Sequence, residues 1–338
     1  MNKKHLLLAA IAFQILAVAA ISISKEWVLA TGEEVILQTA PIDPRDIFRG
    51  DYVRLDYAFS QIATSRLDSD IVDNGLKKGE KAYLSLTKNN AGIAQADRLF
   101  NTEPSDQLYL TGRVTSHWPN QWYFKRAKPN KNPDARRHPV KLKYGIERFY
   151  VEQGKGLEME KIRGSRDSFQ VPMLMHVAVS GSGQGVIRSF EWANIAMKTE
   201  LVKSPERDAE DDQASAIMRF TIKNRGQQEI RMPWKPNGCS FSLIPVTTSP
   251  LDSDSSPFKY VLCNVVKTEN KTLSPDQEVS IEFDLNQPHW RLEYKGKSTP
   301  LGKLPWNYRF RIKYNEVNAN DINAQIVSRA FHGRGNID

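Results

Sequence analysis

The sequence predicts a mainly β protein with one N-terminal transmembrane helix, and three observations support this. An uncharged apolar run occupies residues 6–24, near the N-terminus. After it, many short segments alternate apolar and polar residues with period two, which is typical of half-buried strands. Clusters of Gly, Pro, Asn and Asp separate these segments, as expected for turns. We therefore expect a mostly β domain at residues 26–193 and an Ig-like β-sandwich domain at residues 194–338.

The N-terminal run is nearly long enough to cross a bilayer. Its nineteen uncharged residues approach the ~20 needed to span the hydrocarbon core. Residues 1–5 form a short basic head, which the positive-inside rule keeps in the cytoplasm, so the rest of the chain is exported. Two alternatives stay open: an uncleaved anchor at residues 6–24, which the length favours, or a signal peptide cut near Ala17-Val18-Ala19.

Residues 41–57 are the part of the chain that most resembles a signature. Pro41 and Pro44 restrict the backbone, and the neighbouring aspartates favour turns. Gly50 and Asp51 form a turn step, after which Val53, Leu55 and Tyr57 alternate with polar residues. We expect a rigid polar ledge that leads into a strand.

This segment is similar to the motif of the GDYXXLXY protein family of bacteria. The matching residues are Gly50, Asp51, Tyr52, Leu55 and Tyr57. The resemblance is specific over residues 41–57 and extends loosely over residues 26–190. It implies a protein anchored in the bacterial inner membrane, with its body in the periplasm, that accompanies a multi-pass membrane protein. It implies no particular enzymatic activity.

We expect the ledge and strand to form an interaction surface for an integral membrane protein. A stiff segment with charges of both signs would lose little entropy on docking. The residues of this predicted surface are Arg45, Asp46, Arg49, Gly50, Asp51, Tyr52, Leu55 and Tyr57.

The remaining pattern fills both domains with strands. In the first domain we expect strands at residues 35–39, 81–87, 108–114, 142–151, 171–180 and 186–190, a helix within 154–164, and a polar loop at 88–107. In the second we expect strands at residues 218–223, 240–246, 260–266, 279–283, 306–314 and 324–330, with a hairpin-like turn at 224–226. Cys239 and Cys263 lie in this second region, where they form either a disulfide of an exported domain or two buried thiols.

An enzyme is the rival function, and the sequence supports it less well. Signal peptidases and related serine–lysine proteases share a similar turn and strand, but Ile42 stands where their nucleophilic Ser would be. Lys141 and Lys143 offer a general base without a nucleophile. The aspartates of the signature could serve a carboxylate-based hydrolase, although turn capping and pairing with Arg45 and Arg49 explain them better.

Neither a cofactor nor a metal is expected. The six histidines lack metal-ligand spacing, and His176, in an apolar run, is expected to be a core residue. The glycines at 181–185 lack the lysine of a phosphate-binding loop and predict a hairpin turn.

A basic segment offers a third function, which is binding to polyanions. Residues 125–166 carry thirteen Lys or Arg against five Asp or Glu, a local net of +8 that equals the net charge of the chain. The predicted contacts are Lys125, Arg126, Lys128, Arg136 and Arg137. On an exported body the anionic partners would be lipid headgroups or envelope polymers. We do not expect nucleic acid as a partner, because an exported body lies outside the cytoplasm. The alternative is a solvated basic loop.

Overall fold

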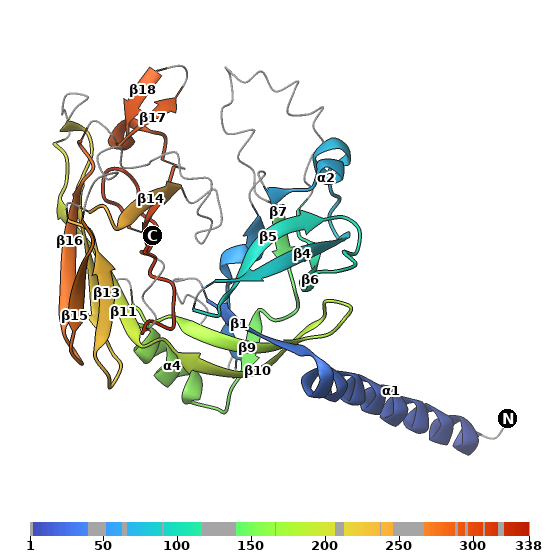
Figure 1. Cartoon of the computed structure of the whole chain (residues 1–338). Helices are drawn as coiled ribbons and strands as arrows, with labels where there is room; N and C mark the ends of the chain where they lie inside the picture. The colour runs from blue at the N-terminus through green and yellow to red at the C-terminus, as the bar shows by residue number, and fades with distance from the viewer. Residues whose placement is uncertain are drawn as a thin grey trace.

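The chain is mostly β, with one long N-terminal helix and a sandwich-like arrangement of its sheets (Figure 1). This confirms the predicted mainly β fold class with an N-terminal helix, whereas the Ig-like character of the second domain stays a prediction. The computed structural model describes residues 3–39, 52–62, 66–89, 91–116, 140–165, 167–206, 213–236, 238–245, 267–287, 290–294, 297–306, 308–316 and 321–337.

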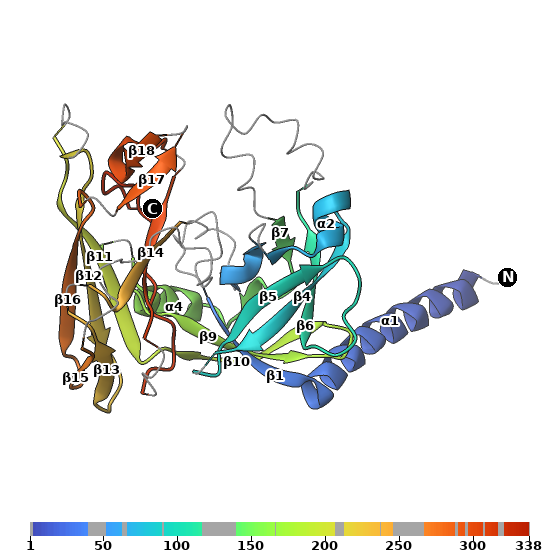
Figure 2. The ribbon, with the colours of Figure 1, turned by 45° about the horizontal axis from the view of Figure 1, so that its top comes forward.

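Helix α1 (Lys3–Thr31) is longer than the predicted apolar run. It continues through Lys25 and Glu26, both good helix formers, and ends before Gly32. The helix projects away from the rest of the protein in two views (Figure 2). Within the described part of the chain, α1 is the helix that is long and apolar enough to cross a membrane, although a signal sequence would pass the same test.

The first half of the body is built from three antiparallel sheets. The first has the order β1-β9-β10, and the second, a five-stranded sheet, has the order β3-β7-β6-β4-β5. The third pairs β2 with β8. The strands are β1 (Glu33–Gln38), β2 (Tyr52–Arg54), β3 (Gln61–Ile62), β4 (Lys81–Lys88), β5 (Ala94–Phe100), β6 (Tyr109–Val114), β7 (Val140–Lys143), β8 (Arg148–Tyr150), β9 (Met173–Val179) and β10 (Gly185–Trp192). The short helices are η1 (Ala58–Ser60), α2 (Ser69–Asn74) and α4 (Lys155–Arg163).

One expected loop in this half is partly a strand. Residues 88–107 were predicted to be irregular because they are polar, yet they contain β5, which pairs with β4. Ala94, Ala96 and Leu99 are buried on one side of β5. Two of these three are alanines, so the apolar side carries too little hydrophobicity to stand out in the sequence.

The second half has a β-sandwich core centred on Phe241. Its sheets are β11-β12-β16, β13-β15, β14-β19 and β17-β18. The strands are β11 (Ile195–Lys203), β12 (Ile217–Asn224), β13 (Ile230–Trp234), β14 (Phe241–Pro245), β15 (Glu269–Leu273), β16 (Glu278–Asp284), β17 (Arg291–Tyr294), β18 (Lys297–Pro300) and β19 (Phe310–Tyr314), with the short helix η6 (Leu301–Lys303).

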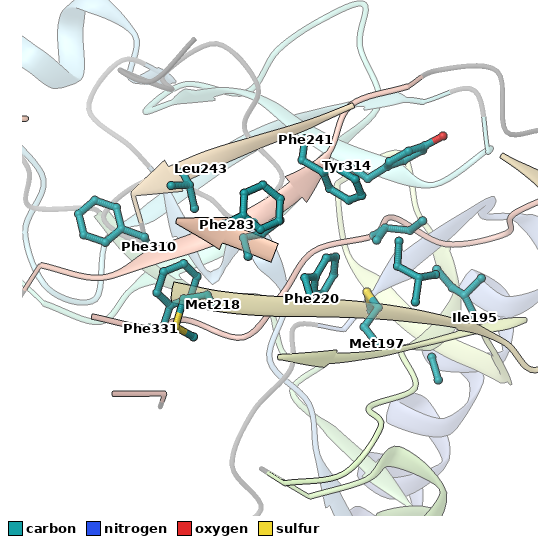
Figure 3. Packing of buried hydrophobic residues seen from close by; sticks show 14 of the residues in the cluster. Ile195, Met197, Met218, Phe220, Phe241, Leu243, Phe283, Phe310, Tyr314 and Phe331 are labelled. Carbon is teal, nitrogen blue, oxygen red and sulfur yellow. The ribbon is translucent and has the colours of Figure 1, made fainter. Parts of the chain in front are cut away.

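The ring of Phe241 joins the sheets of this core (Figure 3). Its centroid lies 6.1 Å from that of Phe220, 5.7 Å from Phe283, 5.2 Å from Trp234 and 5.4 Å from Tyr314. These four rings come from β12, β16, β13 and β19, so a single side chain contacts three of the four sheets.

Three predicted elements of the second half differ from the structure. The turn after Asn224 is not a hairpin, because β12 pairs with β11 and β16 whereas β13 pairs with β15. The strand expected at residues 306–314 begins only at Phe310, and Trp306 is 66% exposed. Residues 324–330 form isolated bridges, such as Lys313 with Val327, rather than a strand. The strand predicted at residues 260–266 lies outside the described residues.

Each half has its own large hydrophobic cluster, and the two halves share both apolar and polar contacts. One large cluster draws mainly on residues 35–179 and the other mainly on residues 193–331. The second cluster also includes Ile93, Val171 and Leu174 from the first half. The side-chain amide of Gln38 on β1 donates to the carbonyl of Gln325 at 2.9 Å and accepts from its N–H at 2.6 Å. The domain boundary near residue 193 stays a prediction.

Candidate functional site

The chain just before the signature segment lies beside the last residue of that segment. Thr39, which follows β1, forms an antiparallel bridge with Tyr57. Between them, Tyr52–Arg54 forms β2 and pairs with β8. Of the predicted interaction surface, the described residues are Tyr52, Leu55 and Tyr57. Arg45, Asp46, Arg49, Gly50 and Asp51 lie outside the described residues.

Leu55 and Tyr57 belong to the core, which corrects their assignment to an exposed surface. Each is only 2% exposed. The N–H of Leu55 donates to the carbonyl of Glu147 at 2.9 Å, and the Tyr57 hydroxyl donates to the carbonyl of Ile146 at 2.9 Å. Their position follows from the alternation of the segment, since Val53, Leu55 and Tyr57 all face inward.

A second tyrosine reinforces this buried layer. The Tyr144 hydroxyl donates to the carbonyl of Phe59 at 2.9 Å, and the Phe59 ring lies between those of Tyr57 and Tyr144, 5.3 Å from each. Burial raises the pKa of Tyr57 and Tyr144 well above the usual range, and the nearby Glu147 carboxylate adds to the effect. Both hydroxyls therefore stay protonated and remain hydrogen-bond donors.

The opposite side of the β2-β8 ribbon is open to solvent. Tyr52 pairs with Tyr150, and Arg54 pairs directly with Arg148. The two tyrosine rings have centroids 5.9 Å apart, and the Arg148 guanidinium carbon lies 5.2 Å from the centroid of the Tyr52 ring. Tyr150 is 69% exposed. We refer to Tyr52, Arg54, Arg148 and Tyr150 as the Tyr–Arg face.

The two arginines of this face stand directly opposite each other. Neither Arg54 nor Arg148 forms an ion pair with any carboxylate in the described parts of the chain. Like charges at directly opposed positions of an antiparallel pair destabilise a sheet. The face therefore carries two positive charges at directly opposed positions of the ribbon.

The C-terminal end of α1, where the helix joins the body, is a second feature that bears on function. Gly32 is the single residue between α1 and β1. Its N–H donates to the Val28 carbonyl at 2.8 Å, and Val28 is buried. A Cβ added at Gly32 would lie 2.6 Å from that same carbonyl oxygen and 3.0 Å from the Val179 oxygen on β9. The helix end is therefore packed directly onto the β1-β9-β10 sheet.

Polar side chains of this sheet hold the same helix end. The Arg188 guanidinium donates to the Leu29 carbonyl at 2.5 Å and lies 3.6 Å from the Glu34 carboxylate. His176 Nδ1 lies 2.9 Å from Glu34, and its Nε2 lies 4.0 Å from Glu191. The hydrogen bond with His176, followed by the charge of Arg188, lowers the pKa of Glu34 below its ordinary value. His176 is thus a half-buried residue that forms a hydrogen bond with Glu34, and not the core residue that was expected.

The other predicted site residues contribute little to a described site. Lys125, Arg126, Lys128, Arg136 and Arg137 all lie outside the described residues. Lys141 and Lys143 are exposed on β7. Cys239 is disulfide-bonded, whereas Cys263 lies outside the described residues, so their pairing stays a prediction. In the described ranges, no three His, Cys, Asp or Glu side chains gather in a group that could hold a metal ion.

Sequence reasoning found Tyr52 but missed its partners on the Tyr–Arg face. Arg148 and Tyr150 are about a hundred residues away in the chain, and the β2-β8 pairing alone brings them to Tyr52. A usable signal was the alternation of Arg148, Phe149 and Tyr150, which puts an arginine and a tyrosine on one side of a short strand.

Comparison with known protein families agrees with the resemblance of the signature segment. The family described as GDYXXLXY protein matches residues 14–190. This range covers much of α1, the signature residues and the first half of the body as far as β10. No curated protein and no solved structure matches the chain. Because the match extends over more than half of the 338 residues, the chain belongs to the GDYXXLXY family.

Proposed function

We propose that this protein is a membrane-anchored accessory subunit that docks to a multi-pass protein of the bacterial inner membrane. In this proposal α1 spans the membrane with its N-terminus in the cytoplasm, and the β body lies in the periplasm. The habit of the family, in which anchored members accompany multi-pass membrane proteins, supports the proposal.

The observation that carries the proposal is the rigid junction between α1 and the body. One residue separates helix from sheet, and the Arg188 hydrogen bond to Leu29 holds the helix end in place. A fixed body explores few orientations relative to the bilayer, so docking to a neighbouring membrane protein costs it little orientational entropy. An enzyme acting on diffusing substrates would be served equally well by a flexible tether.

The experiment is co-purification of the full-length protein from native membranes in a mild detergent, followed by mass spectrometry. We expect a multi-pass protein in stoichiometric amount. A flexible Gly-Ser linker of about twelve residues, inserted between Gly32 and Glu33, should reduce its recovery because the linker lowers the effective concentration of the docking surface.

A matched control places the same linker between Asp106 and Gln107, which are exposed in the β5–β6 connection. This variant should retain the multi-pass protein. A wild-type protein that purifies alone would argue against an accessory role, and equal recovery from both linker variants would remove the argument from the rigid junction.

The predicted disulfide between Cys239 and Cys263 belongs to the same proposal, since the periplasm is an oxidising compartment. Mass spectrometry of the purified protein under non-reducing conditions tests it directly. The pairing is refuted if both cysteines react with a thiol reagent in the native protein.

A further inference from the structure

The Tyr–Arg face has the composition of a protein-binding surface. Tyrosine and arginine are enriched among the residues that dominate the energy of protein interfaces. Here two of each project from one two-stranded ribbon, in two cross-strand pairs. The ribbon is fixed from below by the buried Leu55 and by the hydrogen bond from Tyr57 to Ile146, so the exposed side chains stand on a stiff base.

The opposed arginines indicate the chemistry of the partner. Directly opposite residues of an antiparallel pair have Cβ atoms about 4.5–5.5 Å apart, so Arg54 and Arg148 project from neighbouring positions on one side of the ribbon. The Arg148 guanidinium lies over the Tyr52 ring, 5.2 Å from its centroid, and each guanidinium offers a planar fork of donors that fits a carboxylate in bidentate fashion. Carboxylates placed between the two arginines would relieve their repulsion and gain charge-assisted hydrogen bonds.

The tyrosines favour a polypeptide as the source of those carboxylates. Tyr150 presents most of its ring to solvent, and Tyr52 lies beside it while also contacting Arg148. This pair provides an apolar platform next to the cationic groups, which suits a peptide chain that carries both acidic and apolar side chains. An anionic lipid headgroup would satisfy the arginines alone.

We propose that the Tyr–Arg face binds an acidic segment of the partner membrane protein, with at least two carboxylates between Arg54 and Arg148. The proposal rests on the accessory function proposed above and specifies its contact surface. The binding is expected to weaken as the salt concentration rises, since exposed charge pairs are screened.

The test measures binding of a fluorescent peptide to the full-length protein held in nanodiscs of zwitterionic phosphatidylcholine. The probe is a twelve-residue peptide of alternating Glu and Ser with one central Leu, and the matched probe replaces every Glu with Gln. We expect the acidic probe to bind the wild-type protein and the Gln probe not to bind. The double variant Arg54→Gln/Arg148→Gln should bind at least about tenfold more weakly, because it loses charge-assisted hydrogen bonds.

Two controls separate binding from folding. Arg219→Gln removes an exposed arginine of β12 that is paired with Glu282 at 2.7 Å, and it should leave peptide binding unchanged. The double variant should melt close to the wild-type temperature, because both side chains are exposed and the loss of the contact between Arg148 and the Tyr52 ring opposes the relief of like-charge repulsion. A double variant that unfolds would be replaced by Tyr150→Ala, which removes an exposed ring and should also weaken binding.

The inference would be overturned if the acidic probe failed to bind or bound the double variant equally well. Arginine-dependent binding to nanodiscs with anionic lipid, without binding to the acidic probe, would assign the face to a lipid instead. Co-purification distinguishes this failure from that of the proposed function: a multi-pass protein retained by Arg54→Gln/Arg148→Gln would leave the accessory function in place and move its contact surface elsewhere.

Discussion

Removing the hydroxyl of Tyr57 should destabilise the first half of the body without altering its surface. Tyr57→Phe deletes the hydrogen bond from the hydroxyl to the Ile146 carbonyl, a buried bond of 2.9 Å. The ring keeps its place beside Phe59, at a centroid distance of 5.3 Å, so little packing is lost. The carbonyl loses its partner in a site from which water is excluded.

A buried polar group left without its hydrogen bond costs about 1–3 kcal/mol. For a domain of this size, each kcal/mol lowers the melting temperature by about 2–4 °C. We therefore expect a decrease of several degrees for Tyr57→Phe. Because Tyr144 donates to Phe59 within the same layer, the double variant Tyr57→Phe/Tyr144→Phe should deviate from additivity.

The assay is thermal unfolding of the full-length protein in detergent, followed by tryptophan fluorescence. Trp192 packs against both hydrophobic clusters, with its ring 5.8 Å from that of Phe190, so its emission should change when the first half unfolds. Tyr150→Phe is the control, since its side chain is 69% exposed; it should change stability by less than about 0.5 kcal/mol. Equal melting temperatures for Tyr57→Phe and Tyr150→Phe would refute the reasoning.

Three further changes test other parts of the fold. Gly32→Ala places a Cβ 2.6 Å from the Val28 oxygen, so it should loosen the junction between α1 and the body. The expected readout is a broader distribution of spin-label distances between α1 and the body. An unchanged distribution would count against a tight junction. Phe241→Ala removes the ring at the centre of the second cluster and should cost about 3–5 kcal/mol in a denaturant titration; a cost below 1 kcal/mol would contradict its central place. Burial, the largest cause, lowers the pKa of His332 below its ordinary 6.5. The unfolded chain therefore binds a proton at this histidine at a higher pH than the folded chain does. The free energy of unfolding should fall as the pH drops below about 6.5, by no more than about 1.4 kcal/mol per pH unit. His332→Gln should flatten the melting temperature between about pH 7.5 and 5.5, and an unaltered slope would exclude His332 as the cause.

The sequence predicted strands well where one face is clearly apolar. β4, β9 and β12 were placed within about two residues of their bounds, because long apolar or alternating runs are distinctive. β5 was missed since alanines line much of its buried side. β11 was missed because its buried residues include the weakly apolar Ala196 and Thr199, while the apolar Leu201 and Val202 near its end are exposed.

Pairing between distant strands could not be predicted in the same way. The turn after Asn224 has the residues of a hairpin, yet the Asn224 amide donates to the carbonyls of Gln228 and Leu273, each at 2.8 Å. The second of these ties the turn to β15 and directs the chain from one sheet to another. Local turn chemistry specifies a reversal of the chain, whereas the choice of partner strand depends on which apolar faces can be buried together.

In the candidate site, too, the pairing of distant strands could not be predicted from local sequence. The burial of its residues shows how variants of the motif should be interpreted. Leu55 and Tyr57 lie below the ribbon and Tyr52 lies on its exposed side, so one short motif combines residues that stabilise the fold with a residue available for contact. Loss of partner binding after Leu55→Ala would therefore carry no information about the surface, because a buried leucine replaced by alanine costs about 2–5 kcal/mol. Only variants of the exposed side, such as Arg54→Gln, Arg148→Gln and Tyr150→Ala, separate recognition from folding. If these variants fold normally and still retain the partner, the described part of the motif has a purely structural role.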